Sequence, residues 1–218
     1  MLDIDHSDLV RAIQAVQPKG RRRLIAVAGP PASGKSTYAD SLVAALNGAG
    51  GAALGVPMDG FHLDNAILEA RDLLHRKGAP QTFDQSGFAH LINRLQAEAE
   101  VIYPTFDRSR DIAIAGAKIV PEACKTLVIE GNYLLLDQPG WRDLHRAWDL
   151  SIWVGVDPQV MEARLIQRWV DNGLSPANAK ARALQNDIPN AQIIIDGSIA
   201  ATHMIRTSDG APQTPKRG

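Results

Sequence analysis

Cysteine is almost absent from this sequence, because Cys124 is the only one among 218 residues. A single cysteine can form neither an internal disulfide nor a cysteine-rich zinc site. Long apolar runs are also missing, since no stretch approaches the roughly 20 apolar residues that a membrane-spanning helix needs. The first five residues lack the basic and apolar segments of a signal peptide. We therefore expect a soluble protein of a reducing compartment, namely the cytoplasm.

An excess of either charge is missing too. Lys and Arg total 23, Asp and Glu total 24, and the formal net charge is -1. Proteins that bind nucleic acid through its phosphates usually carry a marked basic excess, so nucleic acid is not expected as the main partner. Hydrophobic residues make up 45% of the chain, which is enough to form the core of one domain of this length.

Short apolar runs alternate with amphipathic segments along the chain. This alternation predicts an α/β fold with a mostly parallel sheet and helices on both faces. A single domain is expected over residues 1–207, followed by a disordered tail over 208–218. The basic run 21–23 is expected to be a solvated approach to the first strand. Strands are expected at 24–28, 53–58, 126–129, 150–156, 193–195 and 203–205, helices at 6–17, 35–46, 64–76, 86–99, 158–171 and from 175, and a small antiparallel excursion at 101–120.

The segment Gly29-Pro-Pro-Ala-Ser-Gly-Lys-Ser-Thr37 matches the phosphate-loop pattern G-x-x-x-x-G-K-[ST]. A buried strand precedes it and a helix follows it, as the pattern requires. Its glycines let backbone N–H groups turn toward an anion, and the following helix adds its positive end. The side chain of Lys35 is expected to reach the β- and γ-phosphates, and Ser36 to offer its hydroxyl to Mg²⁺. The residues expected to bind the nucleotide are Gly29, Pro30, Ala32, Ser33, Gly34, Lys35, Ser36 and Thr37.

The phosphate loop alone does not distinguish kinases, motors, transporter ATPases and GTPases. The sequence has no N-K-x-D for guanine and no L-S-G-G-Q of a transporter ATPase. In a parallel sheet, ligands lie at the carboxyl ends of the strands, so residues at these ends are the next candidates. Asp59 follows the strand expected at 53–58 and is either a general base or part of an Asp-Gly turn. Glu130 ends the strand at 126–129 and is either a Mg²⁺ ligand or a cap.

Two further groups of residues have suitable chemistry for phosphoryl transfer. Arg164 and Arg168 are four residues apart on one helix face, where they either close over a nucleotide or are solvated. The segment 103–110 carries Tyr103, Phe106 and Arg108, which suits contacts to a small polar substrate or an ordinary surface loop. Of the six histidines, His62 is the only one inside a candidate motif, where it could hydrogen-bond a substrate.

Four motifs now stand in one order: Gly29–Thr37, Met58–His62, Tyr103–Arg110 and Val128–Gly131. Together they resemble the phosphoribulokinase, uridine kinase and pantothenate kinase group of P-loop kinases over about residues 20–205. The segments Met58–Asn65, Lys77–Asp84 and Asn186–Asn190 most resemble bacterial proteins called fructose transport system kinases.

The resemblance implies ATP with Mg²⁺ and transfer of a phosphoryl group to an alcohol of a small metabolite. It implies Asp59 as general base, the segments 77–84 and 103–110 as walls of the acceptor pocket, and a helical lid at about 158–185. A sugar such as fructose is the first candidate acceptor, then a nucleoside, then pantothenate. Members of the group often pair, so a homodimer is one expected assembly.

Two departures from uridine kinases weigh against a nucleoside acceptor. Asp59 is followed by Gly60 and not by serine, and Tyr103-Pro-Thr-Phe stands where uridine kinases have Tyr-Asp-Phe. A protein of another class also fits the sequence, namely an ATP-binding regulatory or assembly protein that uses nucleotide as a switch.

Overall fold

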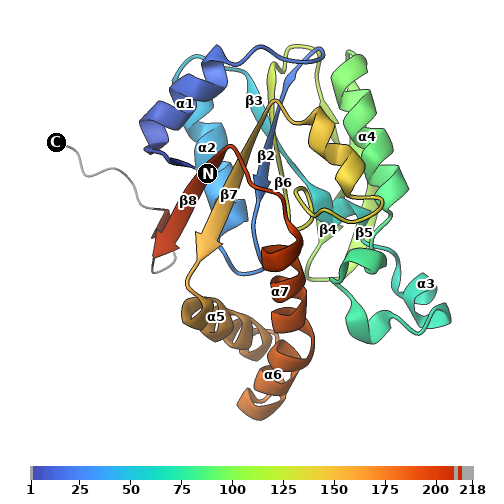
Figure 1. The fold of residues 1–218 in the computed structure, drawn as a ribbon. Helices are drawn as coiled ribbons and strands as arrows, with labels where there is room; N and C mark the ends of the chain where they lie inside the picture. Colours follow the sequence, from blue (N-terminus) through green and yellow to red (C-terminus); the bar gives the residue numbers. More distant parts are fainter. Residues whose placement is uncertain (1, 209–210, 213–218) are drawn as a thin grey trace.

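A computed structural model describes residues 2–208 and 211–212. Its centre is a sheet of seven strands in the order β1-β8-β7-β2-β6-β3, with β9 paired to β8 (Figure 1). Every pair is parallel except β8 with β9. The strands are β1 (Leu2–Asp3), β2 (Arg23–Ala28), β3 (Ala53–Pro57), β6 (Thr126–Gly131), β7 (Leu150–Val156), β8 (His203–Ser208) and β9 (Ala211–Pro212). The predicted parallel α/β architecture is therefore confirmed.

Helices cover both faces of the sheet, because the central strands are apolar on both sides. Helices α1 (His6–Ala15) and α2 (Lys35–Gly48) pack on one face, and α4 (Gln85–Ala97) packs on the other (Figure 1). Alternate residues of β2 point into two hydrophobic cores, one on each face of the sheet. Ile25 faces α1 and α2, whereas Leu24 faces α4. The expected antiparallel excursion is the hairpin of β4 (Val101–Asp107) and β5 (Ile112–Val120), on the α4 side.

A separate group of helices lies below the carboxyl ends of the strands in Figure 1. It comprises α5 (Pro158–Asp171), α6 (Pro176–Arg182), a π-helical turn (Ala183–Asp187) and α7 (Ile188–Gly197). Asp157 and Ser175 cap α5 and α6, each followed by proline at the first helical position. A small apolar core, including Leu165 and Ala191, holds these helices together. The lid was expected at about 158–185, a range that covers α5 and α6 and ends in the π-helical turn, so α7 lies beyond it.

Three predicted elements differ in the structure. Residues 193–195 belong to helix α7 and not to a strand, because burial of Ile194 in the core outweighs the strand preference of an isoleucine run. The helix expected at 64–76 is the short α3 (Asn65–Ala70), which ends before Asp72 at a φ of +53°. The cap of α4 is Asp84 and not Ser86, since the Asp84 carboxylate accepts a hydrogen bond from the amide of Gly87.

The basic run at 21–23 is not uniformly solvated. Arg22 is buried, and its guanidinium donates hydrogen bonds to the carbonyls of Leu95, Glu98 and Ala99 at the end of α4 and to Pro121. The last carbonyls of a helix have no partners within it, and the buried guanidinium supplies a donor to one of them, that of Leu95. Of the tail expected to be disordered, Ser208 and residues 211–212 lie in strands, and the rest is outside the described residues.

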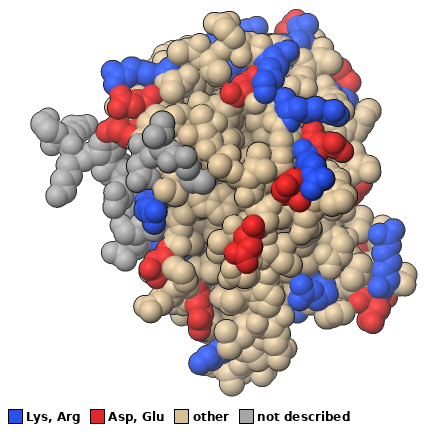
Figure 2. Space-filling view, in the orientation of Figure 1, with Lys and Arg blue, Asp and Glu red and all other residues tan. Residues whose placement is uncertain are grey.

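The described surface carries charges of both signs. On the face shown in Figure 2, acidic and basic side chains are interspersed over the molecule. No helix among the described residues is both long and apolar enough to cross a bilayer.

Candidate active site

Strand register brings the predicted site residues to one edge of the sheet. Glu130 on β6 pairs with Val27 on one side and with Pro57 on the other. Strands β2, β6 and β3 therefore end at the same level. Because Gly29 follows β2 and Asp59 follows β3 by two residues, the phosphate loop, Asp59 and Glu130 all emerge at this edge.

The phosphate loop has the backbone geometry of an anion site. Gly34 has a φ of +85° and directly precedes α2. Glycine has no side chain to cap this helix, so the first N–H groups of α2 are available to bind an anion. Ala32 also has a positive φ, +59°, which is strained for a residue with a Cβ. A Cβ on Gly29 would come within 2.5 Å of the Val154 carbonyl oxygen, so only glycine fits there. This loop can hold phosphate oxygens with backbone amides.

Lys35 and Ser36, which are half-buried, form a polar group beside the loop with Glu130, which is buried. The Ser36 hydroxyl donates to Glu130 Oε2 over 3.2 Å. Burial lowers the pKa of Lys35, and the charges of Glu130 and Asp59 partly oppose this change. Burial raises the pKa of Glu130, and Lys35 opposes that change in turn. The lysine and the two carboxylates are therefore close enough to act on one another.

The oxygens of Ser36 and Glu130 fit Mg²⁺, because this cation prefers hydroxyl and carboxylate ligands. No cluster of three or more His, Cys, Asp or Glu side chains suited to a metal occurs in the described chain. A single carboxylate is sufficient for Mg²⁺, which usually keeps several waters and binds substrate phosphates. The site therefore suits Mg²⁺ that arrives with a nucleotide.

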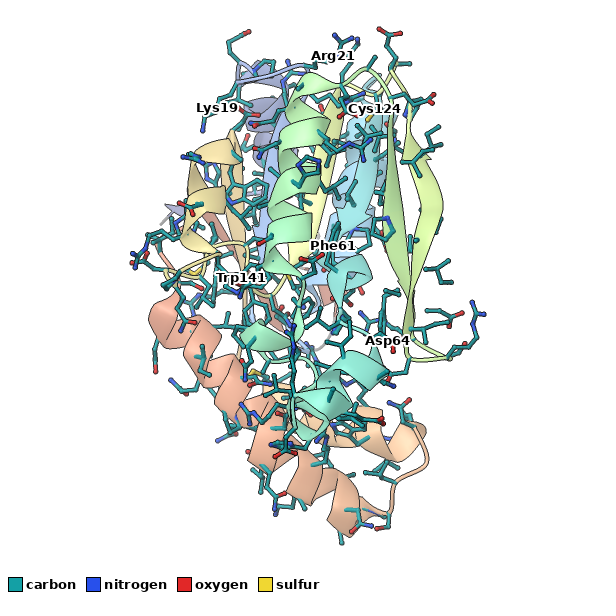
Figure 3. All side chains as sticks on the ribbon, turned by 90° about the vertical axis from the view of Figure 1, so that its right-hand side faces the viewer. Lys19, Arg21, Phe61, Asp64, Cys124 and Trp141 are labelled. Atoms are coloured by element: carbon teal, nitrogen blue, oxygen red, sulfur yellow. The ribbon has the colours of Figure 1, made fainter. Side chains whose placement is uncertain are left out.

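Asp59 lies in a 3₁₀ turn (Met58–Phe61) directly after β3. Its Oδ2 atom accepts a hydrogen bond from Arg108 Nη2 over 2.6 Å. An aromatic contact fixes this turn, since Phe61 contacts Phe88 in the first turn of α4. Trp141 contacts Phe88 as well, and Figure 3 labels Phe61 and Trp141 beside α4.

His62 lies directly after the same turn. Its Nδ1 atom is 2.8 Å from the carbonyl oxygen of Asp59, and because a carbonyl only accepts, Nδ1 carries the hydrogen. Nε2 then keeps a lone pair and can accept a hydrogen bond from a substrate. The rings of Phe83 and Phe106 lie 4.1 and 4.5 Å from the imidazole centroid. Burial lowers the pKa of His62, so the ring is neutral near pH 7.

Tyr103 is not placed as predicted. Its side chain is buried in the core, and its hydroxyl donates to the carbonyl of Gly55 on β3 over 3.2 Å. It fixes the hairpin to the sheet, whereas Phe106 and Arg108, farther along the same strand and turn, reach the site. Successive side chains of a strand point to opposite faces, so Tyr103 faces the core and Phe106 of the same strand faces the site.

Close packing explains why residue 60 is glycine, and the sequence did not reveal this contact. A Cβ on this residue would lie 2.5 Å from the carbonyl oxygen of Pro104 and 2.7 Å from its carbonyl carbon. The turn that carries Asp59 is therefore pressed against the backbone of β4. Serine, as in uridine kinases, does not fit at this position without a shift of one of the two segments.

Arg164 and Arg168, both on α5, occupy different positions. Arg164 Nη1 donates to the carbonyl of Ala32 in the phosphate loop over 3.0 Å, and its Nη2 is buried without a hydrogen-bond partner among the described residues. Arg168 Nη2 lies 3.6 Å from Asp187 Oδ1. Burial is the main cause of the lowered pKa of Lys35, and the charge of Arg168 adds to it in a minor way. Arg164 thus touches the phosphate loop directly, with a donor to spare for an anion.

Sequence reasoning missed Asp187 and the residues around it. The Asp187 carboxylate faces Arg168 and also accepts from the indole of Trp169. Its neighbour Asn186 donates to the carbonyl of Lys77, in the expected acceptor wall, over 3.3 Å. The only available signal was the resemblance over 186–190, because the π-helical turn that points these side chains inward has no simple sequence pattern.

The site geometry agrees with comparisons to known proteins. Residues 24–209 match the Phosphoribulokinase / Uridine kinase family. The chain belongs to this family. It is 31% identical to YggC, an uncharacterized protein of Escherichia coli, over 92% of this chain and 84% of YggC. It is 32% identical to "Putative uridine kinase C227.14" of Schizosaccharomyces pombe, over 84% of this chain and 82% of that protein.

A solved structure extends this similarity. The crystal structure of a "putative fructose transport system kinase" from Silicibacter sp. TM1040 is 50% identical, with a TM-score of 0.88 over 92% of this chain and 98% of that chain. YFH7 of Saccharomyces cerevisiae has a TM-score of 0.80 at 17% identity, which shows a common fold. The predicted membership in this group of P-loop kinases is confirmed.

Proposed function

We propose that this protein is an ATP- and Mg²⁺-dependent kinase that phosphorylates a hydroxyl group of a small metabolite. The observation that carries the proposal is the meeting of three features at one sheet edge. These are an anion-binding loop with Lys35, a hydrogen-bonded hydroxyl and carboxylate pair at Ser36 and Glu130, and the separate carboxylate of Asp59. This arrangement provides a place for the phosphates, for the cation and for the acceptor proton.

Each residue has a distinct part in the reaction. Asp59 accepts the proton of the acceptor hydroxyl as its oxygen bonds to the γ-phosphorus, and the bond between that phosphorus and the β,γ-bridging oxygen breaks. Lys35 and Arg164 offset the negative charge that moves to the leaving ADP. Ser36 and Glu130 would hold Mg²⁺, which supplies further charge neutralisation when bound. Arg168 would join Arg164 when the lid closes.

Similarity and geometry together suggest which acceptors to test. One relative is described as a fructose transport system kinase and another as a uridine kinase, so a sugar and a nucleoside are both candidates. A third relative, from Mycolicibacterium vanbaalenii, is named pantothenate kinase. His62, Phe106 and Arg108 offer a hydrogen-bond acceptor, an apolar ring and a cation to such a molecule.

The direct test measures ADP release from MgATP across these three acceptor classes. Asp59→Asn should lower kcat by about 10²- to 10⁴-fold with ATP binding unchanged, because a general base is lost and the phosphate loop is not touched. Asp64→Asn is the matched control, since Asp64 is an exposed carboxylate that caps α3 and asparagine also caps helices well.

Stimulation by one acceptor in the wild type but not in Asp59→Asn supports the proposal. If ATP binds tightly and is hydrolysed slowly whatever acceptor is added, and Asp59→Asn changes nothing, the result favours a nucleotide-dependent switch protein.

A further inference from the structure

The proposed base is covered by an arginine. Arg108 follows the last residue of β4, and its guanidinium lies 2.6 Å from Asp59 Oδ2. The Arg108 side chain is 66% exposed, whereas that of Asp59 is 22% exposed. The cation thus reaches in from the surface and occupies Oδ2, one of the two oxygens of this carboxylate. An acceptor hydroxyl that approaches this oxygen has to displace the guanidinium from it.

Neighbouring cations have partners of their own. Lys77 Nζ lies 2.7 Å from both Asp111 Oδ2 and Asn65 Oδ1, and it also donates to the Asp111 carbonyl. Arg110 pairs with Asp107 over 2.8 Å. In the described chain, the only hydrogen bond of the Arg108 guanidinium goes to Asp59. Arg108 is therefore the arginine of this hairpin that loses its partner when Asp59 turns to the acceptor.

The position of Arg108 assigns it to the acceptor side of the site. Phe106, two residues earlier, stacks on His62, and the hairpin backbone touches Gly60 beside Asp59. The nucleotide side already has Lys35 and Arg164 at the phosphate loop. An arginine that leaves Asp59 toward the acceptor needs a new anion, and its planar fork best matches a carboxylate or a phosphate.

We infer that the acceptor carries an anionic group, a carboxylate or a phosphate ester, and that Arg108 moves from Asp59 to this group when the acceptor binds. This inference rests on the proposed function. It narrows the acceptor to hydroxy acids and phosphorylated alcohols, because a neutral sugar or water leaves the guanidinium on the base. The same contact limits ATP hydrolysis in the absence of acceptor.

The test uses matched pairs of compounds that share hydroxyl groups and differ in charge. Suitable pairs are glycerate with glycerol, gluconate with glucose, pantothenate with panthenol, and fructose 1-phosphate or fructose 6-phosphate with fructose. The carboxylates and phosphates form separate arms, which distinguish the two anionic groups. ADP release measures turnover, and calorimetry with Mg²⁺ and a non-hydrolysable ATP analogue measures binding.

We expect an anionic compound to be the substrate and its neutral partner to be at least tenfold poorer in kcat/KM. Arg108→Ala should raise KM for the anionic acceptor by about 10- to 100-fold, as expected for loss of a charge-assisted pair, with KM for ATP unchanged. Arg108→Lys should restore part of the binding. Arg110→Ala is the matched control, because Arg110 is an equally exposed arginine in the same turn that pairs with Asp107.

Asp59→Asn gives a readout that does not require turnover. Without the carboxylate, Arg108 is free, so this variant should bind the anionic compound at least as tightly as the wild type does. Equal use of both members of a pair, equal losses in Arg108→Ala for both members, or no binding of any anionic compound would overturn the inference. Binding that depends on Arg108 without any phosphoryl transfer would support the anion site and refute the kinase function.

Discussion

Replacing Gly60 with alanine tests how the fold positions the proposed base. The added Cβ would lie 2.5 Å from the Pro104 carbonyl oxygen and 3.1 Å from Thr105 Cα, and both are backbone atoms that cannot rotate away. Ordinary contact begins at 3.4 Å, so the 3₁₀ turn and β4 must separate by about 0.9 Å. Asp59 is the adjacent residue and would move with the turn.

The displacement should lower both the rate of phosphoryl transfer and the stability of the fold. A misplacement of about 1 Å near the reacting atoms can lower the rate by about 10²-fold, so kcat should fall to that extent. Overpacking costs about 1–3 kcal/mol, which corresponds to a fall in Tm of roughly 2–12 °C for a chain of this length. ATP binding should persist, because the phosphate loop follows a different strand.

The assays are ADP release with the acceptor that the panel identifies, thermal unfolding, and ATP binding. Gly55→Ala is the control on the preceding strand, because its Cβ would meet only Val43 Cγ2, at 3.9 Å. If Gly60→Ala kept kcat within threefold of the wild type with an unchanged Tm, β4 would not hold the turn, and the reasoning would fail.

Three further substitutions test other parts of the structure. Arg22→Met should lower the free energy of unfolding by about 3 kcal/mol, measured by urea denaturation, because it leaves backbone carbonyls near the end of α4 without donors; an unchanged midpoint would contradict this. Tyr103→Phe should cost about 1 kcal/mol in the same assay and leave the acceptor KM unchanged, whereas a raised KM would return Tyr103 to the pocket. Burial lowers the pKa of His62, so the unfolded chain takes up a proton first as the pH falls below 6.5, and stability is lost there. His62→Asn should make the fall in stability between pH 6.5 and 5 shallower, though not abolish it, because burial also lowers the pKa of His145 and His203.

Much of the fold was predictable because its signals are local. Apolar runs identified β2, β6 and β7, and the phosphate-loop pattern located the start of α2. Proline and capping residues at Asp157 and Ser175 marked the starts of α5 and α6. The convergence of Asp59 and Glu130 on the phosphate loop also followed, because parallel strands present their carboxyl ends together.

The remaining errors arise from contacts between distant parts of the chain. A run of three arginines is usually solvated, and only the end of α4, more than 70 residues away, makes Arg22 a buried residue. Tyr103 and Phe106 are both aromatic residues of one strand, and sequence alone could not tell which faces the core. The isoleucines at 193–195 favour a strand locally, but packing against the main core makes this segment a helix.

The contacts of α6 and α7 with residues 75–76 bear on how the two proposed substrate sites are coupled. Arg182 donates to the carbonyl of His75 over 2.7 Å, and Arg76 donates to Asn190 over 2.9 Å. Helices α6 and α7 cannot swing without carrying this segment with them or breaking these bonds. Occupation of one substrate site should therefore change the affinity of the other, and by thermodynamic linkage the effect must be reciprocal.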